Sequence, residues 1–314
     1  MLHSHDIMES ANKTTFALNS VSNLIADAIM LPIPDLNDPA AFEAWRWNCL
    51  EEQKIPRDIV ANCLLKLDTM IARVRAAMLF TTIDSQRSRE LAESVIRESQ
   101  DVEYFMARVQ LAHLDCLEAC YDPSPKVKIQ PCLLILRQLL VDLEKPLRNV
   151  AIKRELQVRT HHILVEACIL NEEFEQARYH SAEVCSIAPA IGLHYLFSSA
   201  RYQLANVSFK KGNFQEALEY YSSILGNPNT TTVIHQRAIV AKAMTLCGLG
   251  DEDAGDALFD TLEAPSDPNL PMLGQLERLM SYRYPVTAFP VDPKNKTVTP
   301  TVQTVSYIKH VLLA

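Results

Sequence analysis

Apolar residues recur every three or four positions along most of the chain, a spacing that predicts amphipathic helices. The first is expected to begin after Asp38, a good N-cap followed by Pro39, and to run to about residue 53. The second is expected to open at Pro56 and to continue unbroken to Met78. Further helices are expected after Asp84 or Ser85 through Ile96, after Asp101 through Leu117, and over residues 131–143, with stops at residues 121–125 and at Pro146.

Glycine is scarce, with 7 in 314 residues, and the first is Gly192. Sheet-rich and phosphate-binding proteins use glycine in turns and in backbone nests. A long glycine-free region instead fits closely connected helices. Most of the 17 prolines fall between the apolar segments, where they end helices. The expected fold class is therefore all-α.

A repeated pattern runs from residue 150 onward. A large and a small apolar residue come early in a first helix, glycine follows near a turn, and a small residue lies where the second helix touches the first. In the central unit, residues 198–229, the pattern is Leu204, Ala205, Gly212, Phe214, Ala217, Tyr221 and Pro228. The upstream unit has Leu164, Val165, Glu172, Phe174, Ala177, Ser181 and Pro189, and the downstream unit has Ala243, Leu246, Gly250, Asp251, Gly255, Phe259, Leu262 and Pro265.

This pattern resembles the tetratricopeptide repeat (TPR) superfamily over residues 156–268. Two features depart from it. Arg201 stands at the early aromatic position, and Leu164 lies 40 residues before Leu204, whereas the usual period is about 34. The resemblance implies a right-handed α-solenoid of antiparallel helix pairs, because such units bury their apolar faces by stacking on neighbours.

The expected organisation has four parts: an N-terminal extension and linker (1–38), degenerate helical repeats (39–150), TPR-like repeats (151–283) and a tail (284–314). Residues 14–30 fit one amphipathic helix. Pro285, Pro290, Pro293 and Pro300 predict that the tail is largely non-helical and extended. Residues 304–313 fit a short amphipathic helix that caps the last repeat.

By the same resemblance, polar residues of the first helices face a concave groove that holds a peptide or a helix of another protein. The amide of Asn206 suits a peptide backbone, and basic side chains suit an acidic segment or a C-terminal carboxylate. A solvated helix face is the competing interpretation, and the full basic set of carboxylate-clamp TPR domains is not matched. The expected partner-binding residues are Arg201, Asn206, Lys210, His235, Arg237 and Lys242.

The formal net charge of -8 disfavours a nucleic-acid backbone or an anionic membrane as the main ligand. The 8 cysteines form no CxxC pair, which fits buried free thiols in a reducing compartment. The first residues lack the regions of a signal peptide, and the apolar run 24–33 is too short to span a bilayer. An intracellular protein, cytoplasmic or nuclear, is expected.

His113, Cys116 and Cys120 share a helical face and offer three zinc ligands, but a core stripe explains them and no fourth ligand has suitable spacing. The adjacent pair His161 and His162 point about 100° apart on a helix, which fits one buried and one exposed histidine. No catalytic motif is legible. Neither enzymatic activity nor a cofactor nor a metal is therefore expected.

The favoured function is a non-enzymatic scaffold, adaptor or subunit of a multiprotein complex. The alternative is a TPR-type regulator that senses a small ligand or a peptide. Residues 217–284 also weakly resemble the helical-repeat region of COP9 signalosome and proteasome-lid subunits, including Leu270, Pro271 and the run from Leu273 to Arg278. Those subunits continue into a winged-helix module, for which the 30 residues after Tyr284 are too few.

Overall fold

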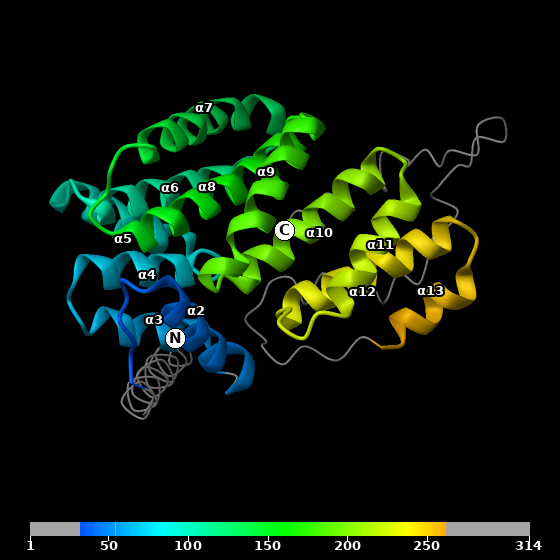
Figure 1. Cartoon of the computed structure of the whole chain (residues 1–314), viewed down its shortest axis with the longest axis horizontal. Helices are drawn as coiled ribbons and strands as arrows, with labels where there is room; N and C mark the ends of the chain where they lie inside the picture. The colour runs from blue at the N-terminus through cyan, green and yellow to red at the C-terminus, as the bar shows by residue number, and fades with distance from the viewer. Residues whose placement is uncertain (1–31, 54, 262–314) are drawn as a thin grey trace, which may run out of the picture.

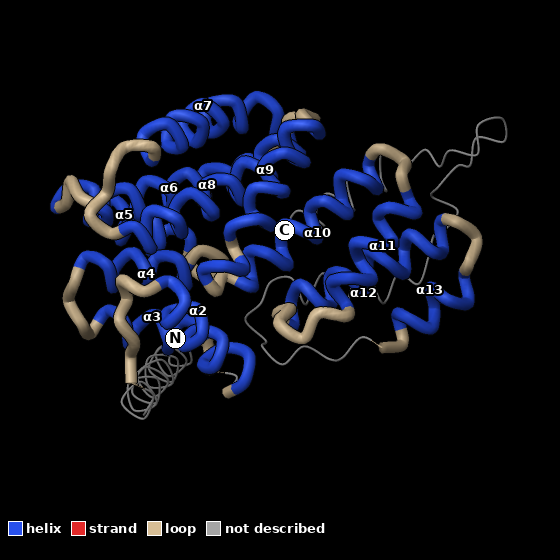
Figure 2. The backbone as a smooth tube through the Cα atoms, in the orientation of Figure 1, coloured by secondary structure: helices blue, strands red, loops and turns tan. Residues whose placement is uncertain are grey.

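The computed structural model describes residues 32–53 and 55–261, in which the chain is helical and contains no strand (Figures 1 and 2). The all-α prediction is thus confirmed for this part of the chain. Expectations for residues 1–31 and 262–314, including both terminal amphipathic helices and the extended tail, lie outside the described residues.

The elements are α2 (Pro39–Trp47), the π-helical turn η1 (Asn48–Glu52), α3 (Arg57–Leu65), α4 (Met70–Phe80), α5 (Ser85–Glu98), α6 (Val102–Tyr121), α7 (Pro125–Leu143), α8 (Val150–Leu170), α9 (Phe174–Ile187), the 3-10 turn η2 (Pro189–Ile191), α10 (His194–Lys210), α11 (Phe214–Leu225), α12 (Thr232–Gly248) and α13 (Glu252–Phe259).

Most helix starts follow from the capping residues in the sequence. Asp38 accepts hydrogen bonds from the amides of Ala40 and Ala41, with Pro39 at the first helical position. Asp84 caps α5 by accepting from the amide of Arg87 at 2.9 Å. The predicted starts after residues 38, 84 and 101 are confirmed.

Two predicted helix boundaries are wrong. The helix expected from Pro56 to Met78 is divided into α3 and α4, because Asp68 adopts a left-handed φ of 47° and Thr69 caps α4. The helix expected from Pro131 begins at Pro125, which occupies the favoured first helical position. Pro131 lies inside this helix.

Helices α4, α6, α8, α10 and α12 pack side by side in a continuous series, which we call the helix row. Helices α5, α7, α9 and α11 each pack on the two row helices that flank them in sequence, and α13 packs on α12. Consecutive helices therefore pack in a repeat-like manner along the chain (Figure 1).

Three helix pairs turn with the same backbone geometry. Glu172, Gly212 and Gly250 follow α8, α10 and α12, and each has a positive φ, of 63°, 80° and 91°. In each turn the next amide donates back to a carbonyl in the preceding helix. These bonds join Glu173 to Cys168 at 2.8 Å, Asn213 to Ser208 at 2.8 Å and Asp251 to Leu246 at 3.0 Å.

Small residues permit the close packing of each pair. Ala177 and Ala217 are fully buried at equivalent positions of α9 and α11. Gly255 takes this position in α13, where a β-carbon would overlap the Cys247 sulfur and lie 3.0 Å from the Ala243 carbonyl oxygen. The contact of α13 with α12 therefore requires glycine.

The largest apolar cluster extends from Leu36 to Val207, so α8 packs with helices on both sides of it. A second cluster joins α10, α11 and α12. Among the described helices, none combines the length and the apolar character needed to cross a membrane.

The buried Arg75 of α4 fixes the N-terminal segment to the helix row. Its guanidinium group forms a two-point ion pair with Glu155 of α8, donates to the Leu36 carbonyl at 3.1 Å and lies over the Phe42 ring. Although burial alone would raise it, the pKa of Glu155 falls to about 2 beside Arg75 and Arg159. Three separate segments therefore meet at one charged pair.

Candidate functional site

Polar side chains from four successive row helices come together, four of them at least partly buried and the fifth, Tyr121, exposed at the surface. We call this group the polar centre: Tyr121 of α6, Glu166 of α8, Tyr202 and Gln203 of α10, and Arg237 of α12. Burial raises the pKa of Glu166, Tyr121 and Tyr202, and the charge of Arg237 opposes this shift in all three, so all three lie near Arg237.

A chain of hydrogen bonds holds one oxygen of Glu166. The Tyr221 hydroxyl donates to Asn206 Oδ1 at 3.0 Å, and Asn206 Nδ2 donates to Gln203 Oε1 at 3.1 Å. Gln203 Nε2 then donates to Glu166 Oε1 over a long 3.5 Å. The carboxyl group is thereby oriented from α11 through α10.

The second oxygen of Glu166 has no donor. Among the described residues, Glu166 Oε2 is buried and no hydrogen-bond partner reaches it. Burial raises the pKa of Glu166 to about 7, although Arg237 and Gln203 oppose this shift. The site thus contains a poorly solvated carboxyl group that is close to its titration point at neutral pH, with one buried oxygen that has no donor among the described residues.

Buried histidines continue the polar series along α8 and α6. His162 Nε2 lies 2.8 Å from Ser199 Oγ on α10. Burial lowers the pKa of His162 to about 3 and that of His113 to about 4, and the charge of Arg159 acts in the same direction. Both rings are therefore neutral at physiological pH, which suits structural hydrogen bonding better than ligand charge recognition.

Asn206 does not present its amide to a partner. Its side chain is completely buried, and its bonds to Gln203 and Tyr221 use both the carbonyl and the amino ends. The expectation that it contacts a peptide backbone directly is not compatible with this burial. Asn206 instead orients Gln203 and, through it, Glu166.

The other five predicted residues fall in different places. Arg237 belongs to the polar centre. Arg201 lies over the Phe197 ring, with 5.5 Å between the guanidinium carbon and the ring centroid, and its charge acts on Cys185 of α9. Lys210 is half-buried in the last turn of α10, and His235 and Lys242 are half-buried on α12. The structure does not gather the six residues into one site.

Sequence reasoning missed Tyr121, Glu166, Tyr202 and Gln203. A signal for Glu166 was present: it follows Leu164-Val165 just as Asn206 follows Leu204-Ala205 in the next unit. Asn206 is buried in its own unit. An acidic residue at the equivalent position of the neighbouring unit, Glu166, is therefore expected to be buried without a compensating charge. No comparable signal marked Gln203 or Tyr121, because their relevance depends on which helices are neighbours.

His113, Cys116 and Cys120, which the sequence pattern attributes to a core stripe, all lie on α6. No group of three or more His, Cys, Asp or Glu side chains in the described part of the chain could hold a metal ion. Hydrogen bonds with Cys120 and Cys132, and then burial, raise the pKa of the Cys116 thiol well above its usual range. The reactive thiolate form is therefore disfavoured. His162 is buried, and the half-buried His161 contacts His180 with 2.9 Å between the two Nδ1 atoms.

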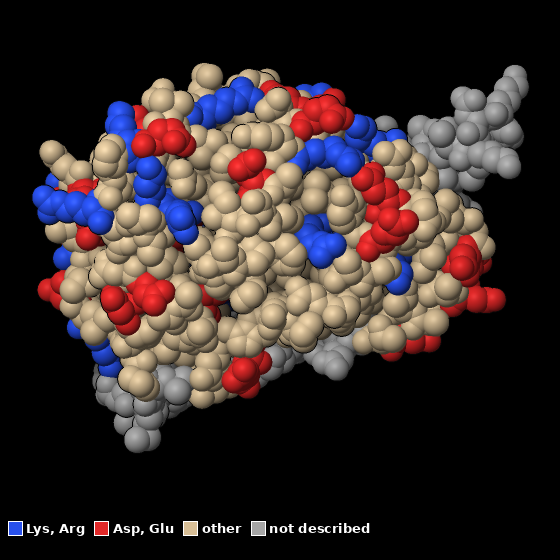
Figure 3. Space-filling model, viewed as in Figure 1, with Lys and Arg blue, Asp and Glu red and all other residues tan. Residues whose placement is uncertain are grey.

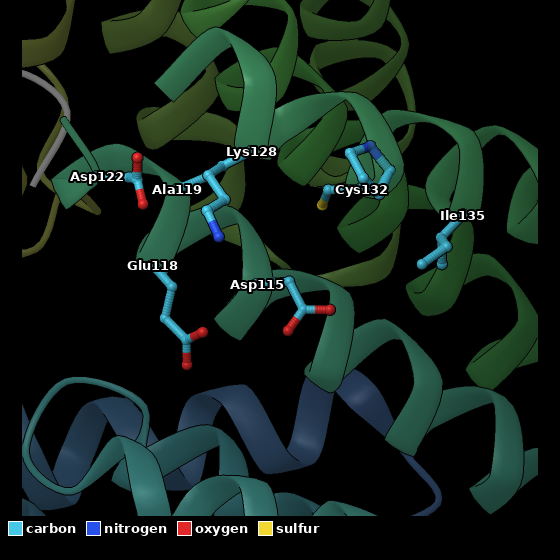
Figure 4. A pocket seen from close by; sticks show the side chains of 8 residues that line it. Asp115, Glu118, Ala119, Asp122, Lys128, Cys132 and Ile135 are labelled. Carbon is cyan, nitrogen blue, oxygen red and sulfur yellow. The ribbon is translucent and has the colours of Figure 1, made fainter. Parts of the chain in front are cut away.

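A depression of about 260 Å³ lies between α6 and α7 and is lined by Asp115, Glu118, Ala119, Asp122, Lys128, Pro131, Cys132 and Ile135 (Figure 4). The Asp115 and Glu118 carboxylates point to the same side, but Arg89 of α5 donates to both, at 2.9 and 2.6 Å. Their charge is therefore already compensated within the chain.

No protein-family model matches the chain, and searches of curated proteins and of solved structures likewise give no match. The functional interpretation therefore depends on the geometry of the polar centre.

Proposed function

We propose that this chain is a non-enzymatic interaction scaffold, an adaptor or a subunit of a multiprotein complex, built as a right-handed TPR-like α-solenoid. A peptide or a helix of a partner protein lies along the concave side of the helix row and makes its polar contact at the polar centre. The observation that supports this proposal is the buried Glu166 Oε2, which has no hydrogen-bond donor among the described residues.

An unpaired buried acceptor costs about 1–3 kcal/mol, so folding alone gives no reason to keep it. Because this oxygen is buried in the free chain, a partner must displace the side chains that cover it; an N–H group of the partner then removes this cost. The Glu166 carboxyl oxygen disfavours partner groups that carry a negative charge or that have no hydrogen-bond donor. A backbone amide, an asparagine or glutamine amide, or a basic side chain of the partner meets this requirement.

The proposal is tested by affinity capture from the lysate of the native source, followed by quantitative mass spectrometry. The baits are the wild-type chain, Glu166→Gln and the matched control Glu219→Gln. Glu219 is an exposed acid on α11, away from the helix row. Loss of a charged hydrogen bond costs about 1.5–3 kcal/mol, so Glu166→Gln is expected to lower capture of the partner about tenfold to a hundredfold.

Equal capture of every protein by all three baits would contradict a partner contact at Glu166. Absence of specific capture, combined with a rise in melting temperature on addition of a small molecule, would favour the alternative of a ligand-sensing regulator. In that case the same melting-temperature measurement on Glu166→Gln would show whether the small molecule also binds at Glu166.

A further inference from the structure

Helix α7 carries an apolar stripe that faces away from the rest of the described chain. Val127, Leu134 and Val141 are 72%, 67% and 60% exposed, and the exposed residues Pro131 and Gln138 lie between them. The inner side of the same helix buries its leucines on α6 and α8. In Figure 1, α7 forms one edge of the molecule, and no described helix covers its outer side.

The stripe has the spacing of a helix-pairing seam. Its five positions, 127, 131, 134, 138 and 141, are separated alternately by four and three residues. Side chains with this alternation lie on one line of a helix and pack into a facing helix. The line extends for about 21 Å, since it spans fourteen steps of about 1.5 Å. A partner helix is therefore the shape that fits it.

The two valines of the stripe are placed symmetrically about Leu134. Val127 and Val141 each lie seven residues from it, whereas Pro131 lies three residues before it and Gln138 four residues after it. When a second α7 is laid antiparallel across a twofold axis at Leu134, each valine meets a valine and each leucine meets its own copy. An unrelated partner helix would require no such symmetry.

The charged residues at the two ends of α7 have opposite signs. Lys126 and Lys128 lie at its start, and Asp142 and Glu144 lie at its end. The first turn has no acidic residue and the last turn no basic one, so this arrangement opposes the helix dipole. An antiparallel copy places the basic start of each helix beside the acidic end of the other. Basic and acidic side chains both lie along this edge in Figure 3.

Contacts within the chain compensate these charges unequally. Lys126 pairs with Glu172 at 2.6 Å, but both side chains are more than half exposed, and exposed pairs contribute little. Asp142 is only 18% exposed and pairs with Lys145 at 3.1 Å and with Arg108 at 3.5 Å, so the acidic end of α7 is compensated better than its basic start.

We propose that α7 is the interface for a second copy of this chain, paired antiparallel across a twofold axis at Leu134. One helix on each side covers less than the roughly 800 Å² per partner of a standard interface, so the dimer is weak, with a dissociation constant of about micromolar or above. This surface is formed by α7, which contributes no residue to the polar centre, and its use does not depend on the proposed function.

Site-directed disulfide formation tests both the partner and its direction. Leu134→Cys is expected to form a covalent dimer under mild oxidation, because the two introduced thiols meet at the axis. Val127→Cys and Val141→Cys are each expected to stay uncrosslinked alone and to crosslink when the two chains are mixed. The wild-type chain, which has 8 cysteines, and Leu249→Cys, at an exposed position at the end of α12, set the background.

Sedimentation of the unmodified chain provides the second test. The wild-type chain is expected to dimerise as its concentration rises, and Leu134→Glu is expected to weaken dimerisation at least tenfold while circular dichroism stays unchanged. Self-crosslinking of Val127→Cys alone would overturn the antiparallel arrangement. A monomer at all concentrations, together with background crosslinking of Leu134→Cys, would overturn the dimer and assign the stripe to another partner.

Discussion

Glu166 lowers the stability of the folded chain but supplies a hydrogen-bond acceptor for a partner. Its carboxyl group lies among packed helices, one oxygen is held by Gln203, and the other has no donor in the described chain. Burial raises its pKa to about 7, which means that the folded state disfavours its charge. A residue that lowers stability at neutral pH is a good candidate for a binding role, because selection for folding alone would replace it.

The raised pKa leads to a pH-dependent stability that one substitution removes. The unfolded chain ionises Glu166 near its ordinary pKa of about 4.5, whereas the folded chain does so near 7, so stability from this group falls as pH rises between these values. Glu166→Gln is therefore expected to be more stable than wild type by about 1–2 kcal/mol at pH 8, and to lose this advantage near pH 5. Urea unfolding at the two pH values measures the difference.

Glu219→Gln provides the control for this measurement, because the exposed carboxylate should change stability by less than about 0.5 kcal/mol at either pH. An advantage of Glu166→Gln that is the same at pH 5 and pH 8 would show that its carboxyl group is ionised at an ordinary pKa in the folded chain.

At the scale of elements, the turns between paired helices are the most local feature of the fold. Glu172 and Gly212 occupy equivalent positions with φ of 63° and 80°. Glycine adopts this conformation without strain, whereas a residue with a β-carbon pays about 1–2 kcal/mol. The turn after α10 therefore has the favourable residue, Gly212, whereas the turn after α8 has an unfavourable one, Glu172.

Exchanging these residues is expected to give opposite effects. Gly212→Ala should destabilise the chain by about 1–2 kcal/mol through backbone strain alone, because a β-carbon there has no neighbour within 4 Å. Glu172→Gly should stabilise it by up to about 1 kcal/mol, since the exposed pair with Lys126 that it loses is weak. Chemical denaturation measures both changes.

Gly226→Ala is the matched control. Gly226 ends α11 with a negative φ of -82°, and an added β-carbon would make an ordinary 3.6 Å contact with the Ser222 carbonyl. It is expected to change stability by less than about 0.5 kcal/mol. A loss at Gly226 as large as that at Gly212 would indicate that strain in the left-handed region is not the cause.

These turns also explain what the sequence could and could not predict. The repeat positions Glu172, Gly212 and Gly250 were legible because each turn depends on its own few residues. The break at Asp68 was missed because Asp-Thr interrupts an otherwise continuous apolar spacing without glycine or proline. The polar centre was not predictable as a group, since α8, α10 and α12 must first be neighbours before Glu166 meets Gln203 and Arg237.

At the scale of the whole molecule, the N-terminal segment contacts distant parts of the helix row. The Arg46 guanidinium carbon lies 5.2 Å from the ring centroid of Tyr195, at the start of α10. A β-carbon on Gly192 would lie 2.8 Å from the Ala40 β-carbon of α2. Repeat proteins otherwise gain stability chiefly from adjacent units, so these contacts couple regions that would be independent.

One contact over a long sequence separation ends at α12. The Glu51 carboxylate accepts hydrogen bonds from the Thr232 amide at 3.2 Å and from its hydroxyl at 2.7 Å. A negative charge at a helix N-terminus is stabilising, and here it is supplied from 181 positions away. The last described helix pair, α12 and α13, is therefore stabilised by the first described helical segment as well as by α10 and α11.

Removal of this contact should loosen the end of the row without affecting its centre. Glu51→Gln is expected to destabilise α12 and α13 by about 0.5–2 kcal/mol, because the carboxylate cap is lost. Hydrogen exchange measured by mass spectrometry should accelerate in α12 and α13 by about twofold to thirtyfold and stay unchanged in α4 and α6.

Glu52→Gln is the control, since Glu52 is an exposed neighbour in the same π-helical turn. Uniform acceleration across all helices would mean that the chain unfolds as one cooperative unit, whereas unchanged exchange in α12 and α13 would show that α10 and α11 alone fix the end of the row.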